Sequence, residues 1–170
     1  MVAADREWGI GKAGGLPWPR LPTDLAHFRR VTSTCTAGQR NAVVMGRKTW
    51  ESKEVACKPL PRRLNIVVSR SAISVPEGVV AVASLDDALA KAAASEETFV
   101  VGGAQVYELA FAHPSLRWIY LTRIDASFAC DTHIEDLDRG FVAMPWEHAA
   151  AHDESGVRYR IERLRRRPET

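Results

Sequence analysis

The segment Ala42-Val43-Val44-Met45-Gly46-Arg47-Lys48-Thr49 joins an apolar run of strand length to a turn that opens a helix. The turn carries two cations, a hydroxyl and free backbone N–H groups, which together make a good cradle for a phosphate. It differs from a nucleotide-binding P-loop, because position 41 is Asn rather than Gly and Arg47 replaces the lysine. A capped helix with surface cations is the alternative interpretation.

Apolar runs of this kind recur along the chain and alternate with helical segments, which is typical of a largely parallel sheet. Further strands are expected at Met1–Ala4, Asn65–Val68, Val79–Val82, Thr98–Val101 and Trp118–Ile124. Helices are expected at Pro22–Val31, Lys48–Ser52, Leu85–Ala94 and Ala104–Ala112. Two later segments, Trp146–Ala151 and Val157–Leu164, predict a closing antiparallel hairpin.

The sequence therefore predicts a single three-layer α/β domain over residues 1–164. It should hold a mostly parallel eight-stranded sheet with a C-terminal antiparallel hairpin and four flanking helices. Residues 165–170 are expected to form a basic tail. A length of 170 residues suits one domain, and 46% apolar with 26% charged residues is ordinary for a globular protein.

Charge and composition argue against several classes of function. The formal net charge is only +2, so the chain is not expected to bind nucleic acid. No apolar run is long enough to span a bilayer, and no basic-then-apolar leader precedes Val2. The three cysteines are widely spaced, which favours reduced thiols in a cytoplasmic compartment over a disulfide framework or a metal site. A monomer is expected.

Two further turns have features that, like those of the first, suit them to bind an anion. Gly102-Gly103 follows the expected strand at Thr98–Val101, and paired glycines let a ligand approach the backbone closely. Ser69-Arg70 follows the strand at Asn65–Val68, and an arginine binds a phosphate through a bidentate fork. Ligands of parallel sheets bind at these strand ends, so we expect one long polyphosphate ligand to span all three turns.

The segment Gly9-Ile10-Gly11-Lys12-Ala13-Gly14 matches the dinucleotide pattern G-x-G-x-x-G. That motif has to open a helix, and Pro17 and Pro19 soon afterwards forbid one. We therefore expect a mobile loop that closes over a site.

Asp24 lies in an unusual place for an acid. Leu21, Leu25 and Phe28 recur at helical spacing and predict a buried stripe, and Asp24 lies within it. Burial raises the pKa of a carboxyl group unless a cation or donor compensates, so Asp24 is a candidate to bind a protonated ring or relay a proton. Satisfaction by the helix N-terminus is the alternative.

The sequence does not determine the partners of two other polar residues. Thr122 is a hydroxyl in a strand that is expected to be buried, and either Asp24 or a carbonyl of its own strand would satisfy it. Arg63 stands just before a strand, where it would either clamp a carboxylate or face the solvent.

Taken in order, these residues resemble the dihydrofolate reductase family. The matching segments are Gly9–Gly11, Leu16–Pro19, Asp24 with Phe28, Val44–Ser52, Pro59-Leu60, Arg63–Asn65, Val68–Arg70, Val101–Gly103, Val106-Tyr107, Leu121–Ile124 and Asp131-Thr132. They cover nearly the whole chain, and the Trp-Pro step and the Ser-Arg pair lean towards the eukaryotic type.

The resemblance implies NADPH-dependent reduction of 7,8-dihydrofolate to tetrahydrofolate, an antifolate-sensitive step of one-carbon metabolism. It implies that Asp24 binds the pterin, that Thr122 braces Asp24, and that Leu16 and Trp18 belong to the loop over the nicotinamide. It also implies that the Gly-Gly peptide is cis. The substrate would contact Val2, Ala3, Asp24, Phe28, Leu60, Arg63, Val101 and Thr122. The cofactor would contact Ala3, Ile10, Gly14, Leu16, Gly46, Arg47, Lys48, Thr49, Ser69, Arg70, Val101, Gly103, Ala104, Gln105, Val106 and Tyr107, with Arg47, Ser69 and Arg70 holding the 2′-phosphate.

The chain departs from the family pattern at several points. The first strand of the family starts several residues earlier, so a shortened strand is expected here. Lys53 replaces an aliphatic residue near the benzoyl group, Arg62 replaces a common glycine, and Ala83 lacks a basic residue of some relatives. The rival interpretations are a pyrimidine reductase of riboflavin biosynthesis with the same fold, and an inactive binder of folate or NADPH.

Overall fold

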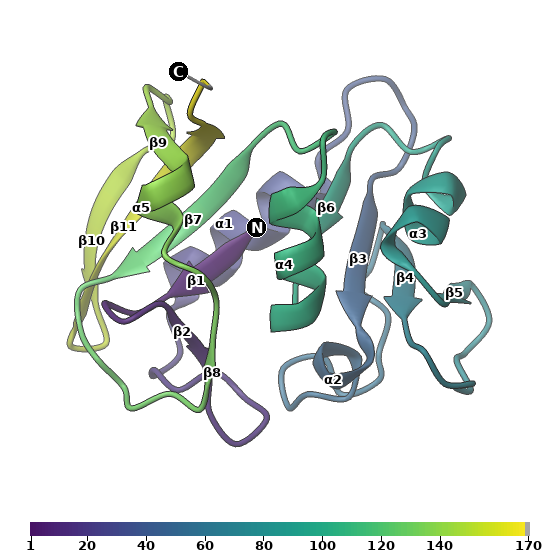
Figure 1. The fold of residues 1–170 in the computed structure, drawn as a ribbon, viewed down its shortest axis with the longest axis horizontal. Coiled ribbons are helices and arrows are strands. Elements are labelled where there is room, and N and C mark those ends of the chain that lie inside the picture. Colours follow the sequence, from purple (N-terminus) through teal and green to yellow (C-terminus); the bar gives the residue numbers. More distant parts are fainter. Residues whose placement is uncertain (169–170) are drawn as a thin grey trace.

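The computed structural model describes residues 1–168, which form eleven strands and five helices (Figure 1). The helices are α1 (Pro22–Ser33), α2 (Arg47–Trp50), α3 (Leu85–Lys91), α4 (Ala104–Ala112) and α5 (Leu137–Gly140). The strands are β1 (Val2–Ala4), β2 (Gly9–Gly11), β3 (Ala42–Gly46), β4 (Leu64–Val68), β5 (Val79–Val82), β6 (Thr98–Val100), β7 (Ile119–Ile124), β8 (Thr132–His133), β9 (Phe141–Met144), β10 (Ala150–Glu154) and β11 (Val157–Arg166).

One half of the domain is a parallel sheet with the order β5-β4-β3-β6. Residues 42–45 of β3 have no exposed surface. Val44 packs in one core cluster with residues of α3 and α4, and Val43 and Met45 pack in another with Trp50. Because both faces of β3 are covered, its sequence is a continuous apolar run rather than an alternating one.

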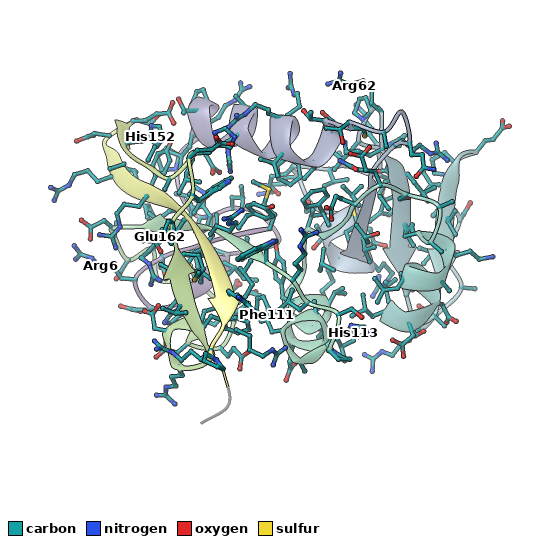
Figure 2. All side chains as sticks on the ribbon, turned by 90° about the horizontal axis from the view of Figure 1, so that it is seen from above. Arg6, Arg62, Phe111, His113, His152 and Glu162 are labelled. Atoms are coloured by element: carbon teal, nitrogen blue, oxygen red, sulfur yellow. The ribbon has the colours of Figure 1, made fainter. Side chains whose placement is uncertain are left out.

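The other half is a mixed sheet with the order β1-β7-β11-β10, and β9 also pairs with β11. β1 and β7 are parallel, whereas β11 is antiparallel to β7, β9 and β10. The two halves meet where the Met1 amino group donates a hydrogen bond of 2.7 Å to the Val100 carbonyl at the end of β6. With α1 on one face of the strands and α4 on the other, the domain has three layers (Figures 1 and 2).

The expected eight-stranded, mostly parallel sheet is wrong in detail, because four of the eight strand pairings are antiparallel. Four elements were also not expected: β2, β8, β9 and α5. They are short, and both residues of β8 are exposed. Such elements have too few buried positions to produce a hydrophobic period in the sequence.

Several boundaries also differ from those expected. α4 begins and ends where it was expected, but α3 stops at Lys91 rather than at Ala94. The closing hairpin exists, although β10 begins only at Ala150 and the turn consists of Ser155 and Gly156, both with positive φ. This backbone matches the twist of a two-residue hairpin.

The expected basic tail begins inside the sheet. β11 continues to Arg166, and Arg165 and Arg166 pair with Val142 and Phe141 of β9. The backbone N–H of Arg167 then donates to the Gly140 carbonyl at 2.9 Å. Residues 169–170 of the tail lie outside the described part of the chain. Among residues 1–168, no helix has the length and apolar character needed to cross a membrane.

Candidate active site

A continuous cleft of about 2010 Å³ runs between the two halves of the domain. The carboxyl ends of β3, β4 and β6 open into it, as expected for a parallel sheet. Single drug-sized ligands fill pockets of about 300–1,000 Å³, so the cleft has room for two ligands. The cleft brings together 22 of the predicted site residues. One predicted residue, Trp18, does not line it. Trp18 is buried in a neighbouring core cluster, with its ring 6.0 Å from that of Phe128.

The turns after β3 and β6 lie against one another. The N–H of Gly46 donates to the carbonyl of Gly102 at 2.8 Å, and the Gly102–Gly103 peptide is cis, as the resemblance implied. A Cβ added at Gly102 would lie 2.9 Å from the Thr49 hydroxyl, and one at Gly46 would lie 3.1 Å from Val106. Gly102, whose φ is +137°, therefore requires glycine, and the approach at Gly46 leaves little room for a side chain.

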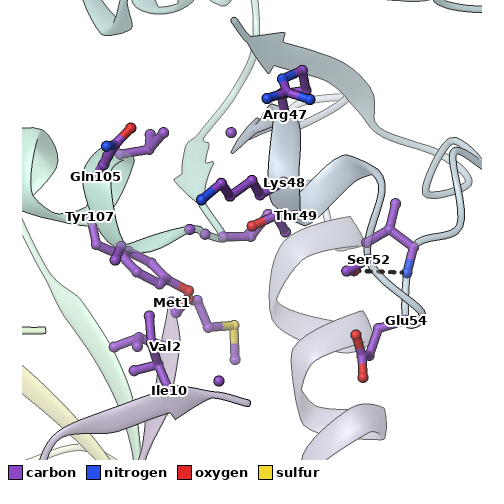
Figure 3. Close-up of a pocket in the computed structure, with 18 of the residues that line it drawn as sticks. Met1, Val2, Ile10, Arg47, Lys48, Thr49, Ser52, Glu54, Gln105 and Tyr107 are labelled. Atoms are coloured by element: carbon purple, nitrogen blue, oxygen red, sulfur yellow. Dashed lines mark hydrogen bonds between the residues drawn. The ribbon is translucent and has the colours of Figure 1, made fainter. Parts of the chain in front are cut away.

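Cations and hydroxyl groups surround these turns. Figure 3 shows Arg47, Lys48 and Thr49 extending from α2 towards the cleft, opposite Gln105 of α4. Arg47 forms an i,i+4 ion pair of 3.1 Å with Glu51. Arg70 is exposed beyond the end of β4 and forms no ion pair within residues 1–168. This end of the cleft is thus cationic and rich in N–H donors.

Asp24 occupies the other half of the cleft, where α1 passes β7. The Thr122 hydroxyl donates a hydrogen bond of 2.6 Å to Asp24 Oδ1, so Asp24 is the partner that this buried hydroxyl needs. Burial raises the pKa of Asp24, and the Thr122 hydrogen bond offsets part of that effect. The carboxyl group therefore retains its proton to a higher pH than an exposed aspartate.

A second carboxylate holds the start of α1 beside Asp24. Glu154 accepts hydrogen bonds from the Thr23 N–H and hydroxyl and from the Tyr159 hydroxyl, at 2.8 to 3.0 Å. The negative charge of Glu154 raises the pKa of Asp24 further, whereas His152 acts in the opposite direction. Glu154 could not be found from a local pattern, because its contact with Thr23 spans 131 positions.

The apolar stripe expected on α1 is only partly buried. Leu21 is buried, but Leu25 is 37% exposed and lines the cleft together with the half-buried Phe28. The buried face of α1 instead carries His27, Thr32 and Ser33. Leu25 and Phe28 are apolar because they form a wall of the cleft, and Leu60 lines the same cleft.

Arg63 is almost fully buried at this end. Its Nε donates to the Pro61 carbonyl at 3.0 Å, its Nη1 donates to the Thr32 hydroxyl at 2.7 Å, and its guanidinium lies over the Phe28 ring. Burial lowers the pKa of Arg63, and the nearby charge of Arg62 acts in the same direction. Lys53, expected near the benzoyl group, is exposed and does not line the cleft.

The glycine-rich loop lines the cleft. Its Leu16 N–H donates to Glu54 at 2.9 Å, and its Ala13 N–H donates to Asp131 at 2.8 Å. Sequence reasoning missed Glu54 and assigned no role to Asp131, because each contact joins residues far apart in the chain. Tyr107 lines the cleft, and its hydroxyl donates to the Met1 carbonyl at 2.7 Å.

The fold and the cleft define an α/β protein that binds its ligands at the carboxyl ends of parallel strands. The sequence profile of the family described as Dihydrofolate reductase matches residues 1–166. The chain is 37% identical over 174 residues to the dihydrofolate reductase of Mus musculus, covering 95% of this chain and 93% of the relative. It belongs to the dihydrofolate reductase family.

Other relatives are longer. The bifunctional dihydrofolate reductase-thymidylate synthase of Glycine max is 43% identical over 169 residues, which are 94% of this chain and 32% of the relative. A putative dihydrofolate reductase of Human herpesvirus 8 is 38% identical over 173 residues, which are 95% of this chain and 82% of the relative. The chain thus spans about a third of the length of the plant bifunctional relatives.

Proposed function

We propose that this protein reduces 7,8-dihydrofolate to 5,6,7,8-tetrahydrofolate, with NADPH as the cofactor. The observation that carries this proposal is the half-buried Asp24–Thr122 pair, which shares one cleft with the cationic strand-end turns. A carboxyl group held by a buried hydroxyl suits a ring with adjacent N–H donors, and the turns suit a diphosphate.

The residues at the strand ends fit NADPH. Gly46, Gly102 and Gly103 line the cleft, and the absence of side chains there lets the turns after β3 and β6 pack closely against Thr49 and Val106 with their backbone at the cleft surface. Lys48 and Thr49 add a charge and a hydroxyl, and Arg70 is free to bind the 2′-phosphate. When bound, NADPH supplies the hydride.

The chain's own residues position the substrate and manage its proton. Asp24 accepts hydrogen bonds from N3 and the 2-amino group of the pterin, while Thr122 fixes the orientation of Asp24. The proton that N5 needs would reach it through solvent near Asp24. Phe28 and Leu60 hold the rings, Arg63 binds the glutamate α-carboxylate, and the loop carrying Leu16 excludes water.

A single assay tests the proposal. Addition of dihydrofolate to the protein with NADPH should cause loss of NADPH absorbance. Binding of both ligands without turnover would instead identify an inactive relative, and reduction of a pyrimidine but not of dihydrofolate would identify a pyrimidine reductase. The presence of Asp24, Phe28 and Arg63 in the cleft favours the folate reaction.

A further inference from the structure

Glu154 connects the β10–β11 hairpin to the start of α1. Its Oε1 accepts hydrogen bonds from the Thr23 N–H at 3.0 Å and from the Thr23 hydroxyl at 2.9 Å, and its Oε2 accepts one from the Tyr159 hydroxyl at 2.8 Å. Leu21, the residue before α1, has no side-chain group that could bond the free N–H groups of the first turn. The hairpin therefore supplies the cap that the helix sequence lacks.

The first turn of α1 carries both this cap and the carboxyl group of the cleft, because Asp24 directly follows Thr23. Glu154 holds Thr23 from β10, and Thr122 of β7 holds the side chain of Asp24. Glu154 itself does not line the cleft. Two neighbouring residues of α1 are thus fixed by two different strands, and the orientation of Asp24 depends on both.

Glu154 also brings a negative charge to this turn. Within residues 1–168 it forms no ion pair with a basic side chain. Burial would raise the pKa of Glu154, but the hydrogen bonds from Tyr159 and Thr23 outweigh burial and hold the pKa below its ordinary value. Burial, followed by the contact with Glu154, raises the pKa of Tyr159, so the tyrosine stays protonated as the donor. Glu154 is therefore ionised at neutral pH.

The ionisable groups that act on Asp24 come from the hairpin. After burial and the Thr122 hydrogen bond, the charge of Glu154 raises the pKa of Asp24 and that of His152 lowers it, and Asp24 in turn acts on Tyr159. The His152 ring stacks on the Tyr159 ring at 5.0 Å, and Figure 2 shows His152 on the hairpin near α1. A negative charge favours the protonated form of every group near it.

We propose that Glu154 is a positioning residue for dihydrofolate reduction, which orients Asp24 through Thr23 and adds a negative charge behind the substrate end of the cleft. This inference rests on the proposed function, which places the pterin at Asp24. The charge favours a proton at Asp24 and at N5 of the pterin alike. The hairpin thus sets the pH range of the reaction, although Glu154 does not line the cleft.

The test compares kcat across a pH series for two variants of Glu154. Glu154→Gln removes the charge but keeps an oxygen that accepts the Thr23 bonds. The fall of kcat with rising pH should move to a lower pH by about 0.5 to 1, which lowers kcat on the alkaline side about three- to tenfold. Glu154→Asp keeps the charge on a shorter side chain. Its pH midpoint should stay unchanged, whereas KM for dihydrofolate should rise about two- to tenfold, the effect of one lost hydrogen bond.

Asp153→Asn is the matched control. It makes the same charge change at the neighbouring position, which is exposed and points to the opposite face of β10. An unchanged pH profile in Glu154→Gln would overturn the inference, as would an equal displacement in Asp153→Asn.

A second measurement does not depend on turnover. In the ligand-free protein, titration of the Asp24 carboxyl group by ¹³C NMR should show a lower midpoint in Glu154→Gln than in the unmodified protein, and equal midpoints would overturn the inference. If dihydrofolate is not turned over at all, the proposed function fails, and this titration still decides whether the charge of Glu154 acts on Asp24.

Discussion

At the scale of single residues, the charged form of Asp24 destabilises the fold, but its carboxyl group serves the proposed reaction. Its carboxyl group lies between α1 and β7, where burial disfavours the charged form and the Thr122 hydroxyl compensates in part. Fold stability alone would not select an acid on this wall, beside Leu25 and Phe28. A group that is held at such a cost is commonly functional.

Replacement of the Asp24 carboxyl group tests its proposed roles in pterin binding and in proton supply. We expect Asp24→Asn to nearly abolish turnover at neutral pH, with a loss of about 10²- to 10⁴-fold, because the amide supplies no proton and mismatches the N–H donors of the pterin. Activity should recover in part in acid, where the substrate protonates itself. The measurement is kcat across a pH series, and a variant with unmodified kcat at neutral pH would refute the role of Asp24.

Asp24→Asn should lower activity but raise the stability of the fold at neutral pH. Because the folded pKa of Asp24 is raised, the folded state binds this proton more tightly than the unfolded state does. The contribution of Asp24 to stability is therefore complete below the ordinary value of 3.8 and is lost as pH rises through the raised pKa. Thermal melts should show Asp24→Asn to be more stable than the unmodified protein at neutral pH. If the difference in melting temperature between the variant and the unmodified protein grew as the pH fell, the predicted direction of this effect would be wrong.

At the scale of elements, the turn after β6 carries a strict requirement on side-chain size. Gly102 has a φ of +137°, and a Cβ there would lie 2.9 Å from the Thr49 hydroxyl. The turn after β3 is hydrogen-bonded to the carbonyl of Gly102, so a shift at Gly102 displaces both.

We expect Gly102→Ala to lower the free energy of unfolding by about 2 kcal/mol and to weaken NADPH binding as well. Gly140→Ala is the matched control, because no atom lies within 4 Å of its added Cβ and its φ is not positive. Denaturant unfolding gives the comparison. Equal effects of about 0.5 kcal/mol or less in both variants would contradict the close-approach argument.

The elements also show where a sequence pattern is sufficient. β3, β5 and α4 were expected within a residue of their observed ends, since a fully buried strand or an apolar helix leaves a clear pattern. β9 was missed because two of its four residues are exposed, and its existence depends on pairing with β11. Leu25 and Phe28 follow a helical period, but that period does not show that they line the cleft rather than the core.

At the scale of the whole molecule, the cleft has two chemically different ends. Strand-end turns with Arg47, Lys48 and Arg70 lie at one end, and Asp24 lies towards the other. The net charge of +2 conceals this division, because acidic side chains elsewhere balance the total. Ligand selection thus depends on the local distribution of charge rather than on the sum.

Charge reversal at Arg70 should discriminate between the two nicotinamide cofactors. We expect Arg70→Glu to raise KM for NADPH about 10- to 100-fold and to change KM for NADH little, because only NADPH carries the 2′-phosphate. Arg40→Glu is the control, since it makes the same charge change at an exposed residue outside the cleft. Steady-state kinetics with both cofactors provide the measurement, and equal effects on the two would remove the 2′-phosphate assignment.

Local chemistry in the sequence determined the parallel half of the fold, the three turns at strand ends and the peculiarity of Asp24. Each depends on residues close together in the chain, such as a buried strand followed at once by Gly46 or Gly102. Only the tertiary structure decided that Thr122 bonds Asp24, that Glu154 holds Thr23, and that half of the strand pairings are antiparallel. The two hydrogen-bonded contacts join residues 98 and 131 positions apart, and the partners are selected by packing of the whole chain rather than by any local period.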